Sequence, residues 1–339
     1  MITENSKIRD GAVIHHPIHL LDRVAMVAMR LMVGSMKGSS LTGPSSREQF
    51  DELMEKTPAA DGVTYEEAEV GGVAGWWCRP DDAVAGAAIL YFHGGAYVVG
   101  SARAYQHFVG QVAARAKVAA FVPEYGLAPE HPFPAAVDEA LACYKGLVEK
   151  GFGKIALAGD SAGGGLALVL LSLLVAKARD VSVLCPAGAA VMSPWTDLAL
   201  SGTSMETRAE ADPLLTKESL ASTARLYLGG HDPRDPLASP LYGDLAGLPP
   251  VRMHVGEDEI LLDDSLRYGE RIESQGGTVQ IHTWQGMTHV FPSNVALLHA
   301  AKEALDDIGN FLRQQFVGDP GDAGNLISLS SASIEGRLR

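Results

Sequence analysis

Cysteine is scarce in this chain of 339 residues, and the few that occur follow no pattern. The three cysteines, Cys78, Cys143 and Cys185, are odd in number and widely spaced, without the C-x-x-C spacing of a metal or redox motif. This usage argues against a disulfide framework and against a zinc site. A reducing cytoplasm is therefore the expected compartment.

Basic charge is also in short supply, since 27 lysines and arginines face 41 aspartates and glutamates, for a net charge of -14. Nucleic acids and anionic membrane surfaces attract basic patches, so neither is expected as a partner. The apolar segment at 20–32 carries Asp22, Arg23 and Arg30, and is too short and too charged to span a bilayer. No signal-peptide cleavage site follows an apolar run near the N-terminus. We expect an amphipathic helix packed on the body, and no stable membrane insertion.

The chain is rich in a regular exchange of apolar strands and helices. Continuous apolar runs such as 87–92 are typical of strands buried on both faces, and Gly71-Gly72 between two strand patterns indicates a hairpin. Strands are expected at 64–70, 73–79, 87–92, 118–125, 154–158, 187–192, 251–255 and 279–284. The last six alternate with helices, which predicts an α/β fold: an eight-stranded, mostly parallel sheet flanked by helices, with an antiparallel start. Residues 1–55 are expected to hold helices and loops without a strand.

The stretch Gly159-Asp160-Ser161-Ala162-Gly163 stands between an expected strand and a buried helix pattern at 165–177. Its G-x-S-x-G spacing is that of a nucleophile elbow. The glycines let the strand and helix backbones approach, and the serine is left above the helix N-terminus. Free N–H groups and the positive dipole end there favour an oxyanion. The pattern predicts Ser161 as a nucleophile and the Ala162 amide as an oxyanion donor.

A second glycine pair follows the buried strand at 87–92, in the run His93-Gly94-Gly95-Ala96-Tyr97. A backbone with few side chains can turn so that its amides point at a substrate oxygen. We expect the amides of Gly94, Gly95 and Ala96 to complete an oxyanion hole with that of Ala162. His93 is expected to brace the loop by hydrogen bonding and not to act as an acid or base.

A serine hydroxyl needs a base, and that base needs a carboxylate to fix its tautomer. Of the eleven histidines, His289 follows the last expected strand, where a loop reaches back over the carboxyl edge of the sheet. It is the expected base, whereas His254 and His282 lie within strands and are expected to be packed. The acid is expected in the segment that leaves the strand at 251–255 and opens a helix. Its carboxylates are those of Glu257, Asp258, Glu259, Asp263 and Asp264, and spacing alone does not choose among them.

With these motifs in place, the chain resembles the hormone-sensitive lipase family of α/β-hydrolase esterases, in the bacterial branch that carries GDSAGG. The resemblance covers about residues 50–316. It rests on HGGA at 93–96, YGLAPEHPFPA at 125–135, GDSAGG at 159–164, SPWTDL at 193–198, EILLDD at 259–264, and His289. The acidic position of the family's motif falls on Glu259, where aspartate is commoner, and Asp258 remains an alternative. Further departures are Ala96 in place of a third glycine and Gly126 where arginine is common.

The resemblance implies a serine carboxylesterase that hydrolyses short- to medium-chain esters, with Ser161, His289 and Glu259 as its triad and no cofactor. It implies a helical cap, formed by residues 1–50 and an insertion at about 199–225, over a hydrolase core at 51–318. The remaining residues, 319–339, are expected to form a flexible tail. A homodimer through an edge strand such as 279–284 is also implied. The expected substrate-pocket residues are Tyr97, Trp195 and Leu261.

Other functions fit the same motifs. A lactone, amide or carbamate hydrolase would use the same triad and would differ only in the pocket. A lipase acting at a lipid interface would need the apolar segment at 20–36 for contact. Outside enzymes, a small-molecule receptor is the alternative, but receptors that resemble this family lack the histidine that is present here as His289.

Overall fold

The computed structural model describes residues 12–34, 43–180 and 183–316, so the expected tail at 319–339 lies outside the described residues. Within them, one sheet has the strand order β1-β9-β8-β7-β6-β4-β5-β3-β2. Only β3 runs against the other strands. The strands are β1 Val13–His16, β2 Val63–Val70, β3 Val73–Pro80, β4 Ala87–Phe92, β5 Ala119–Pro123, β6 Lys154–Asp160, β7 Ala189–Met192, β8 Val251–Gly256 and β9 Val279–Trp284.

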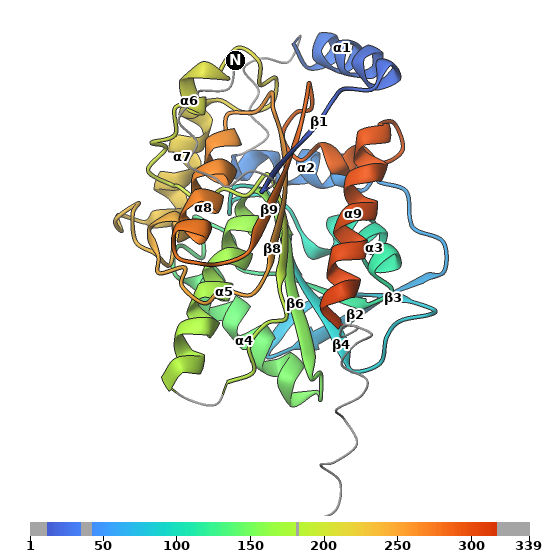
Figure 1. Ribbon diagram of the computed structural model, residues 1–339, viewed down its shortest axis with the longest axis vertical. Helices are drawn as coiled ribbons and strands as arrows, with labels where there is room; N and C mark the ends of the chain where they lie inside the picture. Colours follow the sequence, from blue (N-terminus) through green and yellow to red (C-terminus); the bar gives the residue numbers. More distant parts are fainter. Residues whose placement is uncertain (1–11, 35–42, 181–182, 317–339) are drawn as a thin grey trace, which may run out of the picture.

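Helices cover both faces of this sheet. Figure 1 shows α4, α5 and α8 on one face and α3 and α9 on the other, while α1, α6 and α7 gather towards one end of the molecule. The interior strand β4, which lies between β6 and β5, is buried at all six of its residues, and this accounts for its unbroken apolar sequence. The helices are α1 Leu20–Gly34, α2 Arg47–Met54, α3 Ala102–Ala116, α4 Ala135–Glu149, α5 Ser161–Asp180, α6 Ser204–Thr207, α7 Lys217–Leu228, α8 Leu262–Ser274 and α9 His299–Phe316.

The expectation of eight strands and a strand-free N-terminal region is wrong, because β1 adds a ninth strand parallel to β9. Its four residues, Val-Ile-His-His, are too short and too polar to give a strand pattern, and they pair with residues far along the chain. The His16 ring stacks on Trp284 at 3.8 Å between centroids, and its Nε2 lies 2.9 Å from Nδ1 of His282. Since β1 covers β9, the strand 279–284 is not the free edge at which a dimer was expected.

The helix that follows β1 is fastened to the body at its first turn. The buried carboxylate of Asp22 accepts hydrogen bonds from the amides of His299 (2.9 Å) and Ala300 (2.8 Å) at the start of α9. A carboxylate at a helix N-terminus satisfies free amides and favours the positive end of the helix dipole. This contact places α1 beside the end of the sheet where the candidate site lies.

By length and composition, α5 is apolar enough to cross a membrane, but its packing inside the protein explains this composition. Two thirds (67%) of its most apolar window, Ser161–Ala178, is buried inside the protein. The helix packs against β6, β7 and α4. The apolar sequence of α5 is therefore that of a core helix.

Candidate active site

The turn from β6 into α5 holds Ser161 in a strained backbone conformation, with φ at 52°. A side chain at Gly163 would meet the carbonyl oxygen of Phe92 at 2.1 Å, and one at Gly159 would meet that of Gly163 at 2.5 Å. Glycine is therefore required at both positions, as the sequence motif predicts. The positive φ sets the serine at the start of the helix, above amides that lack intrahelical partners.

The loop after β9 brings His289 to this serine. Its Nε2 lies 2.9 Å from Oγ of Ser161, within hydrogen-bonding distance. The loop is held against the end of β8, where a side chain at Gly256 would meet the carbonyl oxygen of Met287 at 2.2 Å. With Nε2 accepting from the serine hydroxyl, the imidazole can take up its proton.

Glu259 and Asp258 take different directions, although they are neighbours in the sequence. Glu259 is fully buried, and its Oε1 lies 3.6 Å from Nδ1 of His289. Asp258 instead points towards α1, where its Oδ2 accepts a hydrogen bond from Arg30 at 2.6 Å. Of the two, only Glu259 faces the imidazole. Hydrogen bonds of this kind are often long before substrate binds, so 3.6 Å is compatible with an orienting carboxylate.

Ser193, which follows β7, links two loops. One is the loop after β8 that carries Glu259 (the acid loop), and the other is the loop after β9 that carries His289 (the histidine loop). Its hydroxyl donates to Oε2 of Glu259 at 2.8 Å and accepts from the amide of Val290 at 3.1 Å. The residue is fully buried and has φ at 46°. Ser193 belongs to the SPWTDL motif, but its role could not be predicted from sequence because its partners lie 66 and 97 residues away.

The glycine loop after β4 differs from expectation at one donor. The amide of Gly94 donates to Oδ1 of Asp160 at 3.2 Å, so it is turned away from the serine and is unsuited to bind an oxyanion. The next residues, Gly95 and Ala96, have φ of 116° and 54°, which redirects the backbone. No described residue accepts a hydrogen bond from their amides. Gly95 and Ala96 are therefore the loop's available donors, with Ala162 at the first turn of α5.

Asp160 supports the same loop from beneath the serine. Its buried carboxylate also accepts from the hydroxyls of Tyr91 (2.7 Å) and Tyr105 (3.2 Å). Burial raises the pKa of Asp160 to about 6, while these hydrogen bonds favour the charged form. His93 braces the loop as expected, with Nδ1 2.7 Å from the carbonyl oxygen of Gly94.

The charge environment favours the protonated form of His289. Burial by itself lowers the pKa of this imidazole, but the carboxylates of Glu259, Asp212 and Asp160 outweigh it and hold the pKa above the ordinary 6.5. For the Glu259 carboxyl, burial raises the pKa, and the contact with His289 opposes this shift. An imidazolium formed during a reaction would thus be stabilised by several negative charges.

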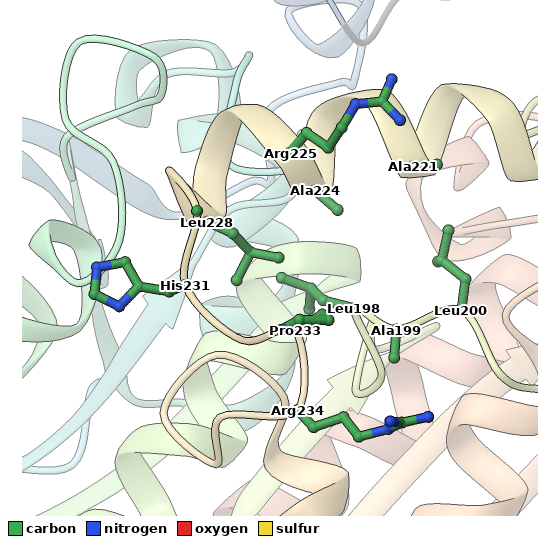
Figure 2. A pocket seen from close by; sticks show the side chains of 11 residues that line it. Leu198, Ala199, Leu200, Ala221, Ala224, Arg225, Leu228, His231, Pro233 and Arg234 are labelled. Carbon is green, nitrogen blue, oxygen red and sulfur yellow. The ribbon is translucent and has the colours of Figure 1, made fainter.

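A surface depression of about 680 Å³ lies beside α7 and away from these groups. Figure 2 shows Leu198 and Leu228 pointing into it, while Arg225 and His231 point away. Neither the serine nor the histidine of the site lines it. Its walls are mainly apolar.

The three expected pocket residues are all buried, and none lines this depression. The ring of Tyr97 stacks on Tyr227 at 3.8 Å between centroids, and the amide of Trp195 donates to the carbonyl oxygen of Ser161 at 2.9 Å. Leu261 immediately precedes α8. They form part of the packing around the site, and their contact with substrate stays a prediction.

One cluster has the residue types of a metal site: His254, His282 and Asp307, whose ligand atoms lie within 4.8 Å of one another. The guanidinium of Arg252 already contacts the Asp307 carboxylate and lies 3.3 Å from Nε2 of His282. Trp284 donates to Nδ1 of His254 at 3.1 Å, so the proton of that ring faces Asp307. Because the arginine supplies the positive charge and the lone pairs are engaged, the cluster suits a packed hydrogen-bond network and not a metal ion.

A nucleophile elbow on a mostly parallel sheet, with a histidine and a buried carboxylate behind it, defines a protein of the serine-hydrolase type. A family model described as alpha/beta hydrolase fold matches residues 89–293, and the chain belongs to this family. The esterase EstE5 has a similar structure, with a TM-score of 0.79 and 37% identity over 86% of this chain and 99% of that one. An esterase from the bacterial hormone-sensitive lipase family gives the same TM-score and identity over 88% and 98%. The resemblance to that family is thereby confirmed.

Curated relatives agree with this assignment. An acetyl-hydrolase of Streptomyces hygroscopicus is 38% identical over 282 residues, which are 83% of this chain and 90% of that protein. An ethyl acetate hydrolase of Pseudomonas putida is 33% identical over 244 residues, which are 70% and 76% of the two chains.

Ser193→Ala removes the 2.8 Å hydrogen bond to Glu259 and leaves a buried carboxylate oxygen poorly satisfied. We expect kcat for p-nitrophenyl acetate to fall about tenfold with KM nearly unchanged, since an unsatisfied buried acceptor costs about 1–3 kcal/mol.

The matched control is Ser239→Ala, another fully buried serine, whose hydroxyl bonds Pro233 and Leu198 away from the site. It is expected to lose stability while keeping kcat. Equal kcat losses in the two variants would contradict a specific role for Ser193.

Proposed function

We propose that this protein is a serine carboxylesterase in which Ser161 attacks the ester carbonyl and His289 serves as base. The observation that carries the proposal is the 2.9 Å contact between Ser161 Oγ and His289 Nε2, backed by the buried Glu259 carboxylate. The serine proton passes to Nε2 as the bond from Oγ to the carbonyl carbon forms. His289 then returns the proton to the alcohol as the ester C–O bond breaks, and water releases the acyl group by the same route.

The negative oxygen of the tetrahedral intermediate is bound by backbone amides. The amides of Gly95, Ala96 and Ala162 are the donors that support this role, and Gly94 is not among them because it donates to Asp160. In other hydrolases one such donor contributes about 2.7–4 kcal/mol to transition-state stabilisation. Ala96 preserves the amide that a third glycine would supply, so its methyl group removes no donor.

Short acyl chains are the substrates best supported. Two relatives are named for acetyl or acetate substrates, the Streptomyces acetyl-hydrolase and the Pseudomonas ethyl acetate hydrolase. We extend this to short- to medium-chain carboxylic esters, with the N-terminal helix and the 199–225 insertion acting as a cap. Lactones, amides and carbamates would use the same groups, and a series of such substrates would separate them.

We also propose a cytoplasmic location and a homodimer. The scarcity of cysteine supports a cytoplasmic protein. A homodimer formed at the β9 end of the sheet would use β1 as its edge strand, because β1 covers β9.

Replacing the acid distinguishes Glu259 from its neighbour. Glu259→Gln removes the charge that stabilises the imidazolium, and we expect kcat/KM for p-nitrophenyl butyrate to fall about 10³-fold or more. Asp258→Asn, the matched control, alters a partly exposed pair with Arg30 and is expected to change kcat/KM less than about threefold. Ser161→Ala should be inactive. The reverse order of the two acid variants would assign the acid to Asp258.

The wild-type pH profile tests the base. His289 must be neutral to accept the serine proton, and neighbouring carboxylates hold its pKa above 6.5. We expect kcat/KM to reach its maximum above that pKa and to fall about tenfold per pH unit below it. A rate that stays constant from about pH 8 to about pH 5 would contradict histidine as the base.

A further inference from the structure

A carboxylate from the segment between α6 and α7 reaches the acid loop of the site. Asp212 is buried, and its Oδ2 accepts a hydrogen bond from the amide of Ile260 at 3.0 Å. Its other oxygen accepts from the amides of Leu214 (2.8 Å) and Leu215 (3.0 Å) in its own segment. One side chain thus joins the 199–225 insertion to the residue that follows Glu259.

The N-terminal helix closes the same junction from the other side. Arg30 of α1 donates to the carbonyl oxygen of Ala211 and to the carboxylate of Asp258. Residues 211–212 are therefore linked to residues 258–260 by two neighbouring contacts, one through Arg30 and one through Asp212. The two segments expected to form the cap converge on the loop that carries Glu259.

We propose that Asp212 is a positioning residue of the hydrolytic reaction, which holds the Glu259 loop through the Ile260 amide and places a further negative charge towards His289. The inference rests on the proposed function, since it concerns the base of that reaction. Asp212 touches neither the serine nor the histidine in a hydrogen bond, so it acts through the acid loop and through its charge.

The charged groups that face His289 come from three elements. Glu259 lies on the loop after β8, Asp160 ends β6, and Asp212 lies on the insertion, and all three raise the pKa of the imidazole. In Asp212→Asn the amide can still accept from Leu214 and Leu215, but its NH₂ group then faces the Ile260 N–H, donor against donor. The substitution removes one charge and loosens one contact without changing the size of the side chain.

The experiment compares pH profiles of kcat and kcat/KM for Asp212→Asn and wild type with p-nitrophenyl acetate. Removing the charge lowers the pKa of His289, so we expect the acid limb to move down by about 0.5 pH unit. We expect kcat at its plateau to fall about three- to tenfold, with KM changed less than about twofold, because the buried Asp212 carboxylate bonds the amides of its own segment and of Ile260. A purely structural role would leave the acid limb in place.

Asp263→Asn is the matched control. Asp263 also links the insertion to the body, accepting from Thr203 (2.6 Å) and from the amide of Ser204 (3.0 Å), and is not among the groups that shift His289. Its acid limb should coincide with that of wild type. If Asp212→Asn does not fold, Asp212→Ser removes the same charge and is measured in its place.

An unmoved acid limb in the Asp212 variant, whether or not kcat falls, or equal shifts in Asp212→Asn and Asp263→Asn, would overturn the proposal. Asp212→Glu, which keeps the charge, should restore the wild-type limb. Failure of the esterase assignment would give a different result from failure of the Asp212 proposal. In that case the wild-type protein itself would show no ester hydrolysis that depends on Ser161.

Discussion

The burial of the Glu259 carboxylate is the constraint on which the rest of the site depends. A charged group without solvent contact is stable only if neighbouring groups replace the lost water, and removing such a partner is strongly destabilising. Here the Ser193 hydroxyl donates to one oxygen, and the His289 ring faces the other. The strand ends, the two loops and the strained backbone of Ser193 can be understood as the arrangement that brings these partners to one carboxylate.

Backbone strain also concentrates around the site. Ser161, Ser193, Ala96 and Val290 all have positive φ although none is glycine. Such conformations cost of order 1–3 kcal/mol each and persist only where surrounding contacts fix them. The close backbone approaches at Gly159 and Gly163, and the hydrogen bonds made by Ser193 and Asp160, are contacts of that kind.

The parts of the molecule that could be predicted from sequence are those set by local pattern. The elbow around Ser161 and the buried strand β4 depend on residues a few positions apart, so the motif and the apolar run are sufficient. The short strand β1 could not be predicted, because its histidines gain their partners from the distant strand β9: Thr283 for His15, and His282 and Trp284 for His16. Choosing between Glu259 and Asp258 from residue spacing alone was equally out of reach, since their directions are set by Arg30 and His289 from distant segments. The Gly94 donor was wrongly expected because the glycine pattern does not show that Asp160 takes up its amide.

The central claim is that Ser161 carries the acyl group during turnover, and the most direct measurement is mass spectrometry of the enzyme quenched during hydrolysis of p-nitrophenyl acetate. The account predicts one acetyl group on the peptide that contains Ser161, formed in the first turnover and lost when substrate is exhausted. It predicts no such adduct in Ser161→Ala. Acetyl transfer to a different residue in the wild-type enzyme, or turnover that persists in Ser161→Ala, would contradict it.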